Sequence, residues 1–372
     1  MDFLQWYAVS GFVYLTKNFM FFYLLKPQLI KKYGYPIEVH PVQTPDGYIL
    51  EMHRIPKKGG RPVLLVHGIL DSSAGFVVSG PGKGLAYILS DLGYDVWMAN
   101  CRGNKYSKKH IFLSPSRKDF WDFSFHELGT LDVPAMVDYI LLNTGFPKVH
   151  YIAHSQGATA LFVMCDQRPG YCDKILSVNA MAPAAYLNHV TSPFIAKIFG
   201  VKEFLPNNEF MISASQLVCK KEAITQPLCT NIVFLICGFN NDQLNKTMLP
   251  AILGHVPAGA SVKQLVHFAQ LVNSGKFSFF DHGWIKNWSK YGSLRPPSYS
   301  LSKVTAPVAL HYSMNDWLAG TKDVMRISDE LPNLNGRYLV SIPKFNHMDF
   351  LFGISAKDAV YNQIVKVMKS YE

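Results

Sequence analysis

The amino-acid sequence predicts an α/β fold built on a mainly parallel, doubly wound sheet. Six short apolar segments alternate along the chain with longer amphipathic segments. The first apolar segment, PVLLVHG at 62–68, is a continuous run ended by glycine, as is typical of a strand buried on both faces. Strands that alternate with helices are joined by crossover connections, which make the sheet parallel and cover both of its faces. With 372 residues, 49% of them hydrophobic, the chain is long enough to bury a large core.

The predicted elements follow one another in a regular order. Buried strands are expected at 62–68, 93–100, 149–155, 175–183, 307–313 and 336–343. The amphipathic segments predict helices at 83–91, 126–142, 156–167, 321–331 and 356–370. In the last helix, Val360, Ile364 and Val367 recur near the period of a helix with one buried face.

One interval, 184–304, interrupts this alternation. It is rich in proline, asparagine and aromatic residues and shows no regular exchange of strand and helix. Ligands of α/β sheets bind beyond the carboxyl ends of the strands, so an insertion at that edge is well placed to cover a site. We therefore expect a largely helical cap or lid at 184–304, between two parts of the core at 33–183 and 305–372. The alternative is an insertion with no role in function.

The first 32 residues form an apolar N-terminal segment with three possible roles. Residues 3–16 carry no charge, Lys17 interrupts them, and residues 19–25 are apolar again. A lysine at the centre of a membrane helix costs about 3 kcal/mol, which argues against a simple spanning helix. Segment 1–32 is thus interpreted as a signal, a signal-anchor or a lead-in that packs on the core.

Charge and motif content exclude several classes of function. The formal net charge of +10 favours anionic partners, either nucleic acid or a lipid surface. The basic residues form no block of five or more, which argues against nucleic acid. No segment has zinc-ligand spacing, and no glycine-rich loop ends in the Lys-Ser/Thr of a phosphate site. We expect no metal, no organic cofactor and no obligate protein partner.

The strongest functional signal is VHYIAHSQGATALFVM, in which an apolar strand runs into Ser155 and then into a helix. A sharp strand–turn–helix connection holds such a serine in a strained conformation, with its hydroxyl at the end of the sheet. Small residues are needed two positions before and after it, because the chain packs tightly around the turn. Gly157 and Ala153 fill these positions. Ser155 is the predicted nucleophile, and an ordinary buried serine is the alternative.

A serine hydroxyl needs a base to take its proton, and a histidine base needs a carboxylate to orient it. In this kind of fold the three residues follow the chain order serine, acid, histidine. The strand at 307–313 is followed by Asp316, and the strand at 336–343 is followed by His347. Asp349 is a rival acid, on the same loop as the histidine. The other histidines considered are interpreted as structural: His255, His267, His282 and His311.

An acyl-transfer site also requires backbone N–H groups that stabilise the negative oxygen of the tetrahedral intermediate. One donor is the residue after the nucleophile, Gln156, and the other comes from the loop after an early strand. The segment LLVHGILDSS fits this second role, because His67-Gly68 ends a strand and allows a sharp turn. We expect the N–H of Ile69 to be the second donor. A simple strand-ending turn is the alternative.

Cysteines and glycosylation motifs point to an oxidising compartment. Cys219 and Cys229 lie close together in a polar stretch and are able to close a short disulfide loop. Asn245 and Asn287 begin Asn-x-Ser/Thr motifs and are candidate glycosylation sites. Whether Cys165 and Cys172 pair stays open. Together these features predict an oxidising compartment, as found in the secretory pathway.

From about Tyr33 to its end the chain resembles the acid lipase family, which includes gastric lipase, lysosomal acid lipase and insect relatives. The matching segments occur in one order along the chain: YGYP, TPDGYILEMHRIP, VLLVHGILDSS, GYDVWMANCRGN, FWDFSFHELGTLDVPA, AHSQGAT, CGFN, HVPAGASVKQLVHFAQ, NDWLA and NHMDF. The resemblance implies an α/β-hydrolase fold with a cap and lid at about 184–304. It also implies a triad of Ser155, Asp316 and His347, oxyanion donors at Ile69 and Gln156, and a Cys219–Cys229 pair. Ala153 stands where the family usually has glycine.

The resemblance implies a serine lipase that hydrolyses triacylglycerols or steryl esters at a lipid–water interface. Activity at acid pH is also only an implication of the resemblance. The insertion contains aromatic residues suited to an acyl channel or to the core of the cap itself: Phe194, Phe199, Phe204, Phe210, Phe277, Phe279, Phe280 and Trp284. A carboxylesterase for smaller soluble esters and a catalytically silent lipid-binding protein are the alternative functions.

Overall fold

The six strands that the sequence predicts form the parallel centre of the sheet. The computed structural model describes residues 26–191, 203–204, 240 and 242–372. The parallel strands are β3 (Pro62–Val66), β4 (Asp95–Met98), β6 (Val149–His154), β7 (Ile175–Met181), β10 (Val308–Tyr312) and β11 (Leu334–Leu339). They lie in the order β4-β3-β6-β7-β10-β11, and each pairs in parallel with its neighbours.

The sheet is mixed, because antiparallel strands that the sequence analysis did not predict extend one edge. β1 (Glu38–Gln43) pairs with β2 (Tyr48–Ile55), and β2 pairs with β4 and with the short β5 (Lys109–His110). In β1 only Val42 is buried, and β2 alternates mostly between buried and partly exposed residues, with Glu51 and Arg54 among the latter. Sequence patterns are less distinct for strands with one partly exposed face than for strands buried on both faces.

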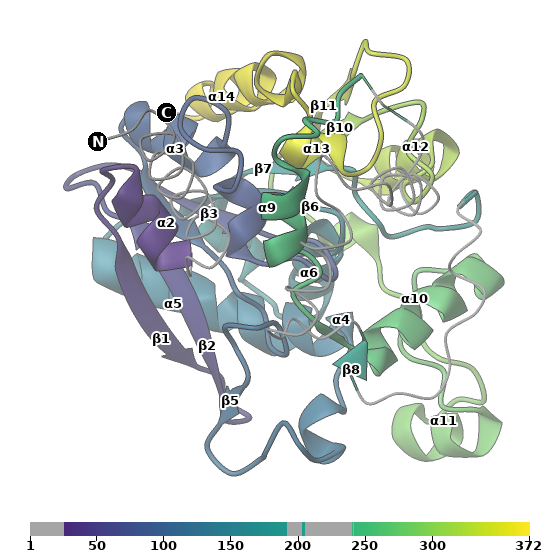
Figure 1. Cartoon of the computed structure of the whole chain (residues 1–372). Helices are drawn as coiled ribbons and strands as arrows, with labels where there is room; N and C mark the ends of the chain where they lie inside the picture. Colours follow the sequence, from purple (N-terminus) through teal and green to yellow (C-terminus); the bar gives the residue numbers. More distant parts are fainter. Residues whose placement is uncertain (1–25, 192–202, 205–239, 241) are drawn as a thin grey trace, which may run out of the picture.

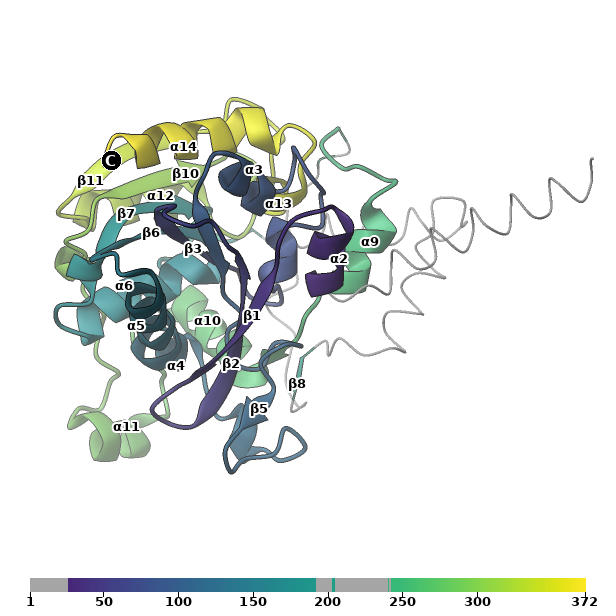
Figure 2. The ribbon, with the colours of Figure 1, turned by 90° about the vertical axis from the view of Figure 1, so that its left-hand side faces the viewer.

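Helices cover both faces of the sheet, as predicted for a doubly wound fold (Figures 1 and 2). On one face lie α3 (Leu85–Asp91) and α14 (Asn362–Lys369), and on the other lie α5 (Val133–Thr144), α6 (Gln156–Gln167) and α12 (Thr321–Glu330). Successive side chains of each strand enter opposite layers. In β3, Leu64 and Val66 enter the core beneath α5 and α6, whereas Val63 and Leu65 enter the core beneath α3 and α14.

Two predicted helices are interrupted by π-helical turns. The helix expected at 126–142 is formed by α4 (Phe125–Glu127), a π-helical turn at Leu128–Asp132 and α5. The helix expected at 356–370 is a π-helical turn at Lys357–Tyr361 followed by α14. The remaining helix of the C-terminal part is α13 (Asp349–Phe352).

The first described helix belongs to the core. α2 (Lys26–Lys32) buries Leu29 and Ile30 against the layer that contains α3 and α14. Residues 26–32, the end of the predicted N-terminal segment, therefore pack on the core. The rest of that segment, 1–25, lies outside the described residues. In the part of the chain that is described, no helix combines the length and apolar character needed to span a bilayer.

The insertion carries its own elements, which lie beside the core (Figure 1). They are β8 (Glu203–Phe204), α9 (Leu249–His255), β9 (Ala260–Ser261), α10 (Val262–Ser274) and α11 (Trp284–Tyr291), and β8 and β9 pair as a separate small sheet. α10 begins with a capping box between Ser261 and Gln264. Helices are thus the longest regular elements in the described part of the insertion.

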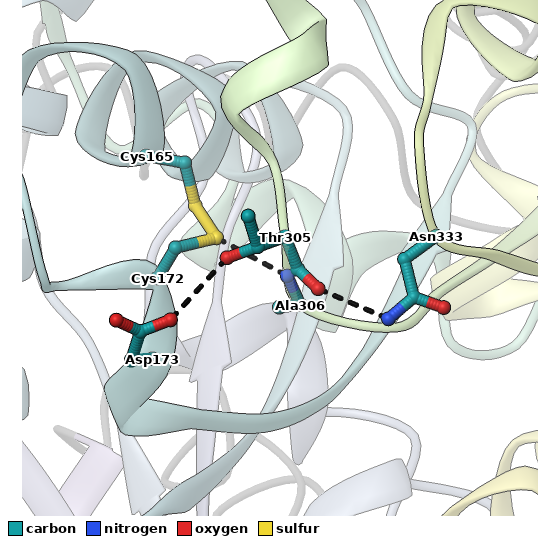
Figure 3. Close-up of a disulfide and its surroundings, with 6 residues drawn as sticks. All are labelled: Cys165, Cys172, Asp173, Thr305, Ala306 and Asn333. Atoms are coloured by element: carbon teal, nitrogen blue, oxygen red, sulfur yellow. Dashed lines mark hydrogen bonds between the residues drawn. A yellow bond between two sulfur atoms is a disulfide. The ribbon is translucent and has the colours of Figure 1, made fainter.

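A disulfide joins Cys165 near the end of α6 to Cys172 in the turn before β7 (Figure 3). This is the pairing that the sequence left open. The Cys172 sulfur accepts from the Ala306 N–H at 3.4 Å, and Asn333 donates to the Thr305 carbonyl at 3.0 Å. The bridge therefore sits where the segment before β10 crosses the end of α6. Cys219 and Cys229, the predicted pair, lie outside the described residues.

Candidate active site

Ser155 occupies the tight turn between β6 and α6. Its backbone has φ 51° and ψ −118°, a left-handed conformation that is unusual for a residue with a side chain. The Ser155 N–H donates to the Met181 carbonyl at 2.9 Å, which ties the turn to the end of β7. A serine at the start of a helix usually caps it with its hydroxyl, but the Ser155 side chain makes no capping bond. The hydroxyl is therefore available for chemistry.

Close packing explains the small residues around this turn. A Cβ atom on Gly157 would collide with the Val66 carbonyl oxygen at the end of β3. A Cβ on Gly68 would lie 2.9 Å from His154 Nδ1 and 3.1 Å from Ser155 Cβ. Ala153 is completely buried in β6, so its methyl group is accommodated where the resembling family has glycine. The turn thus tolerates alanine at 153 but leaves no room for a side chain at 157.

Asp316 and His347 meet across the loops that follow β10 and β11. His347 Nδ1 lies 2.8 Å from Asp316 Oδ2 and 3.0 Å from Oδ1. The N–H groups of Leu318 and Ala319 donate to Asp316 Oδ1 at 2.9 and 2.8 Å. Burial alone would raise the pKa of Asp316, but the charge of His347 and these hydrogen bonds outweigh it and lower the pKa. The carboxylate therefore stays ionised and holds Nδ1 protonated.

The rival acid, Asp349, points into a different network. Its Oδ2 accepts from the Asn346 N–H and from the Asn240 amide, each at 2.8 Å. Burial raises the pKa of Asp349 to about 7. Asp349 therefore supports the loop that carries His347 and makes no hydrogen bond to the imidazole.

His154 connects the nucleophile turn to the histidine loop. Its Nε2 lies 3.0 Å from the His347 carbonyl oxygen, which only accepts, so Nε2 carries the proton. The two imidazole rings are 4.8 Å apart, centroid to centroid. Burial, together with the nearby His347, lowers the pKa of His154 to about 3, so this ring stays neutral. Ser155 Oγ and His347 Nε2 are not hydrogen-bonded to each other here, and such catalytic bonds commonly tighten only when substrate binds.

The two predicted oxyanion donors have no protein acceptor in the described chain. The N–H of Gln156 is the first of α6, and helix N-termini leave such groups unpaired. The N–H of Ile69 belongs to the same peptide group as the Gly68 carbonyl. That carbonyl accepts from His67 Nδ1 at 2.8 Å and from the Asp71 N–H at 3.3 Å. Because the N–H of a trans peptide points opposite to its C=O, these bonds fix the direction of the Ile69 N–H.

His67 is the side chain that sets this peptide. Its Nε2 accepts from the Cys101 N–H at 3.1 Å, so the proton must lie on Nδ1, which donates to the Gly68 carbonyl. The residue after Ile69, Leu70, has φ 63°, so the loop takes a left-handed conformation at a residue that is not glycine. The Leu70 carbonyl accepts from the Ala258 N–H of the insertion at 2.6 Å. The insertion therefore contacts the loop after β3 directly.

A second cap contact reaches the residue beside the nucleophile. Gln264 of α10 donates from Nε2 to Gln156 Oε1 at 3.0 Å, and its Oε1 accepts from the Ser261 N–H at 2.9 Å. Nearby, Lys105 Nζ lies 3.2 Å from His255 Nδ1, and burial lowers the pKa of Lys105 to about 8. The insertion thus touches both sides of the site, at Gln156 and at the loop after β3.

The aromatic residues of the insertion divide between core and surface. Phe277 is buried against Phe125 and Tyr299, and Phe279 stacks on Tyr299, so these two pack on the main hydrophobic core beside α4. Trp284 is exposed and does not line a channel. Phe194, Phe199 and Phe210 lie outside the described residues, and nothing is described of the Phe204 side chain.

The structure argues against glycosylation at Asn287. Its side chain is 1% exposed, and its amide donates to Asp281 Oδ1 at 2.8 Å and to the Leu294 carbonyl at 3.1 Å. Both amide N–H groups are therefore engaged within the fold, which disfavours a glycan at this position. Asn245 is only partly buried and accepts from the Thr247 N–H at 3.1 Å, and it remains a candidate.

Buried His267 predicts a measurable dependence of stability on pH. It stacks on Phe125 at 3.8 Å, and burial lowers its pKa from 6.5 to about 3. Below pH 6.5 the unfolded chain therefore binds a proton that the folded chain does not, and stability is lost as the pH falls toward 3. His267→Gln cannot titrate. We expect urea unfolding of the variant to depend less on pH, by about 1.4 kcal/mol per pH unit between about pH 6 and 4. Parallel curves for the two proteins would contradict the assignment.

Two functional side chains had no distinctive sequence signal. His67 and His154 each lie within a motif singled out for another residue, and their roles depend on partners far along the chain, Cys101 and His347. The available sequence signal was position alone: His154 directly precedes Ser155, and His67 directly precedes Gly68. Within the described residues, no group of three or more His, Cys, Asp or Glu side chains is arranged to hold a metal.

Comparisons with known proteins match nearly the whole described core. Residues 61–354 match the family described as the alpha/beta hydrolase fold, and residues 26–80 match the partial alpha/beta-hydrolase lipase region. Lipase 1 of Drosophila melanogaster is 47% identical over 351 residues, which cover 92% of this chain and 79% of that protein.

Mammalian relatives match over a similar span. Gastric triacylglycerol lipase of Mus musculus is 40% identical over 92% of this chain and 90% of its own length. Lysosomal acid lipase/cholesteryl ester hydrolase of Homo sapiens is 38% identical over 93% of this chain and 90% of its own length. Among solved structures, a protein from Sulfolobus solfataricus shares the fold with a TM-score of 0.64 at 12% identity, over 90% of this chain and 94% of that one.

Proposed function

Because this chain belongs to the α/β-hydrolase lipase family that includes the gastric and lysosomal acid lipases, we propose that it hydrolyses ester bonds of neutral lipids through an acyl-enzyme at Ser155. The observation that carries the proposal is the Asp316–His347 pair, 2.8 Å apart, on the loops that neighbour a strained serine at the end of β6. The names of the relatives support triacylglycerols and cholesteryl esters as the substrate class.

In acylation, His347 Nε2 takes the proton of Ser155 as Oγ attacks the ester carbonyl carbon. The carbonyl oxygen becomes negative and receives hydrogen bonds from the N–H groups of Ile69 and Gln156. The imidazolium then passes its proton to the leaving alcohol, and the C–O bond breaks. Asp316 stays ionised because its pKa is lowered, so it stabilises the imidazolium during both transfers.

In deacylation, water replaces the alcohol. His347 takes a proton from water, whose oxygen attacks the acyl-enzyme carbonyl. Collapse of the second intermediate returns the proton to Ser155 Oγ and releases the fatty acid. The hydrogen bond from Gln264 to the Gln156 side chain ties the cap to the residue whose N–H is one of the proposed oxyanion donors. No metal or organic cofactor takes part in these steps.

The proposed location is the secretory pathway, with a secreted or lysosomal product. The Cys165–Cys172 disulfide supports an oxidising compartment during folding. The name of the lysosomal relative points the same way.

The test compares emulsified trioleoylglycerol, emulsified cholesteryl oleate and a dissolved butyrate ester as substrates of the purified chain. A serine-directed phosphonate is added in parallel, and the labelled peptide is mapped by mass spectrometry. We expect hydrolysis of at least one emulsion and a single label on Ser155. Activity on the dissolved ester alone would favour a carboxylesterase. Absence of both label and activity would favour a lipid-binding protein without catalysis.

A further inference from the structure

Helix α11 presents its apolar side outward. Trp284, Ile285 and Trp288 are between 61% and 68% exposed. Positions 284, 285 and 288 lie on one face of a helix. On the described part of the chain nothing covers this face. An exposed apolar patch of this kind on a water-soluble surface marks a site of association with a protein or a membrane.

The polar side of the same helix is the anchored one. Buried Asn287 bonds to Asp281 and to the Leu294 carbonyl, and the hydroxyl of Tyr291 donates to the Phe280 carbonyl at 3.0 Å. Gly292 ends the helix in a left-handed conformation. These contacts hold α11 in one orientation, so its apolar face is kept outward by specific hydrogen bonds.

A lysine-lined hollow of about 510 Å³ lies beside this helix. Lys263 of α10 and Lys286 and Lys290 of α11 line it, together with Asp122 and His282. Asp122 pairs with Lys263 at 2.8 Å, and Lys290 Nζ lies 3.4 Å from His282 Nε2. The lysines therefore outnumber the single carboxylate, and the hollow carries excess positive charge that complements an anionic headgroup.

Tryptophan beside lysine is the composition of elements that lie in a membrane interface. Indole rings settle at the headgroup level, and lysines reach the anionic groups around them. Figures 1 and 2 place α11 and the segment after β5 at the same end of the molecule. That segment carries Phe112, the side chain of which is 87% exposed.

We propose that α11, with the lysine-lined hollow beside it, docks the protein on a lipid–water interface that carries anionic headgroups. This inference rests on the proposed function and extends it by naming the element that binds the interface. α10 joins the docking surface to the active site, because Lys263 lines the hollow and the next residue, Gln264, bonds to Gln156.

The test measures co-sedimentation of the full chain with phosphatidylcholine vesicles, pure or mixed with phosphatidylserine. The variant Trp284→Ser/Trp288→Ser is expected to bind mixed vesicles at least roughly tenfold more weakly. Lys286→Glu/Lys290→Glu is expected to remove the preference for phosphatidylserine. Hydrolysis of a dissolved butyrate ester is expected to change less than about twofold in both variants, since neither touches the triad.

Matched controls come from elsewhere on the surface. Leu142→Ser removes an 84% exposed leucine of α5. Lys57→Glu/Lys58→Glu reverses two exposed charges that follow the end of β2. β5 pairs with the other end of that strand, at Tyr48 and Ile49. Both controls are expected to bind vesicles like the wild type.

Three results would overturn the inference. They are unchanged vesicle binding by the tryptophan variant, an equal loss in the Leu142 control, and a wild-type dimer in sedimentation velocity that the tryptophan variant dissociates. Vesicle binding requires no turnover. A wild type that binds vesicles through α11 but hydrolyses no ester would therefore refute only the proposed function.

Discussion

Ser155→Ala is expected to lower kcat for trioleoylglycerol hydrolysis by about 10⁴- to 10⁶-fold. Without Oγ no acyl-enzyme forms, and His347 has no hydroxyl proton to take. The oxyanion donors and the cap remain, so weak catalysis by bound water is the only residual route. Initial rates on the emulsion at several enzyme concentrations, with protein quantified by absorbance, measure the loss.

The control for this prediction is Ser177→Ala. Ser177 is buried in β7, and its hydroxyl lies 2.8 Å from His150 Nδ1. Its removal is expected to lower stability but to change kcat less than about tenfold. Ser155→Gly should lose activity like Ser155→Ala. It should nevertheless unfold at a higher urea concentration than Ser155→Ala, because glycine adopts the φ of 51° without strain. Activity of Ser155→Ala above about one hundredth of wild type would assign the nucleophile elsewhere.

Asp316→Asn is expected to lower kcat about 10⁴-fold. An asparagine amide facing Nδ1 favours the wrong tautomer of His347, and it removes the negative charge that stabilises the imidazolium. The residues that bind Asp316 Oδ1, Leu318 and Ala319, donate through their backbones, so an asparagine oxygen keeps the loop in place. Thermal unfolding of the variant measures whether the loss is chemical, and the pH profile of kcat measures the changed base.

The contrast variant is Asp349→Asn. Because the pKa of Asp349 is about 7, its protonated carboxyl is already well populated near neutrality, and asparagine resembles that protonated form. The Asn346 N–H and the Asn240 amide still find an oxygen acceptor. We expect kcat to fall less than about tenfold. Equal losses in the two variants would mean that the carboxylates act as one unit and that the Asp316 assignment is incomplete.

Strands buried on both faces were predictable from sequence because most of their positions are apolar. β3 and β6 are uniformly buried, and their mainly apolar runs located both the loop of Ile69 and the turn of Ser155. β1 and β2 were missed because one of their faces is partly exposed and carries charged residues. The strands that were predicted and those that were missed therefore differ in whether both faces are buried.

The site was predictable as far as it depends on chain order. Ser155, Asp316 and His347 each follow a predicted strand, and parallel strands bring such loops to one edge of the sheet. The supporting contacts were not predictable, because they join residues with no shared pattern, such as His154 with His347 and Gln156 with Gln264. Asn287 shows the same limit: its motif is local, but its burial depends on the fold of the insertion.

The order of the three site residues along the chain has a consequence for synthesis. Ser155 follows β6, near the middle of the chain, whereas His347 follows β11, the last strand of the sheet along the described sequence. Domains fold as they emerge during translation, from the N-terminal side first. Since Ser155 and His347 follow strands of one sheet, the proposed nucleophile and its proposed base come together only when β11 has joined that sheet.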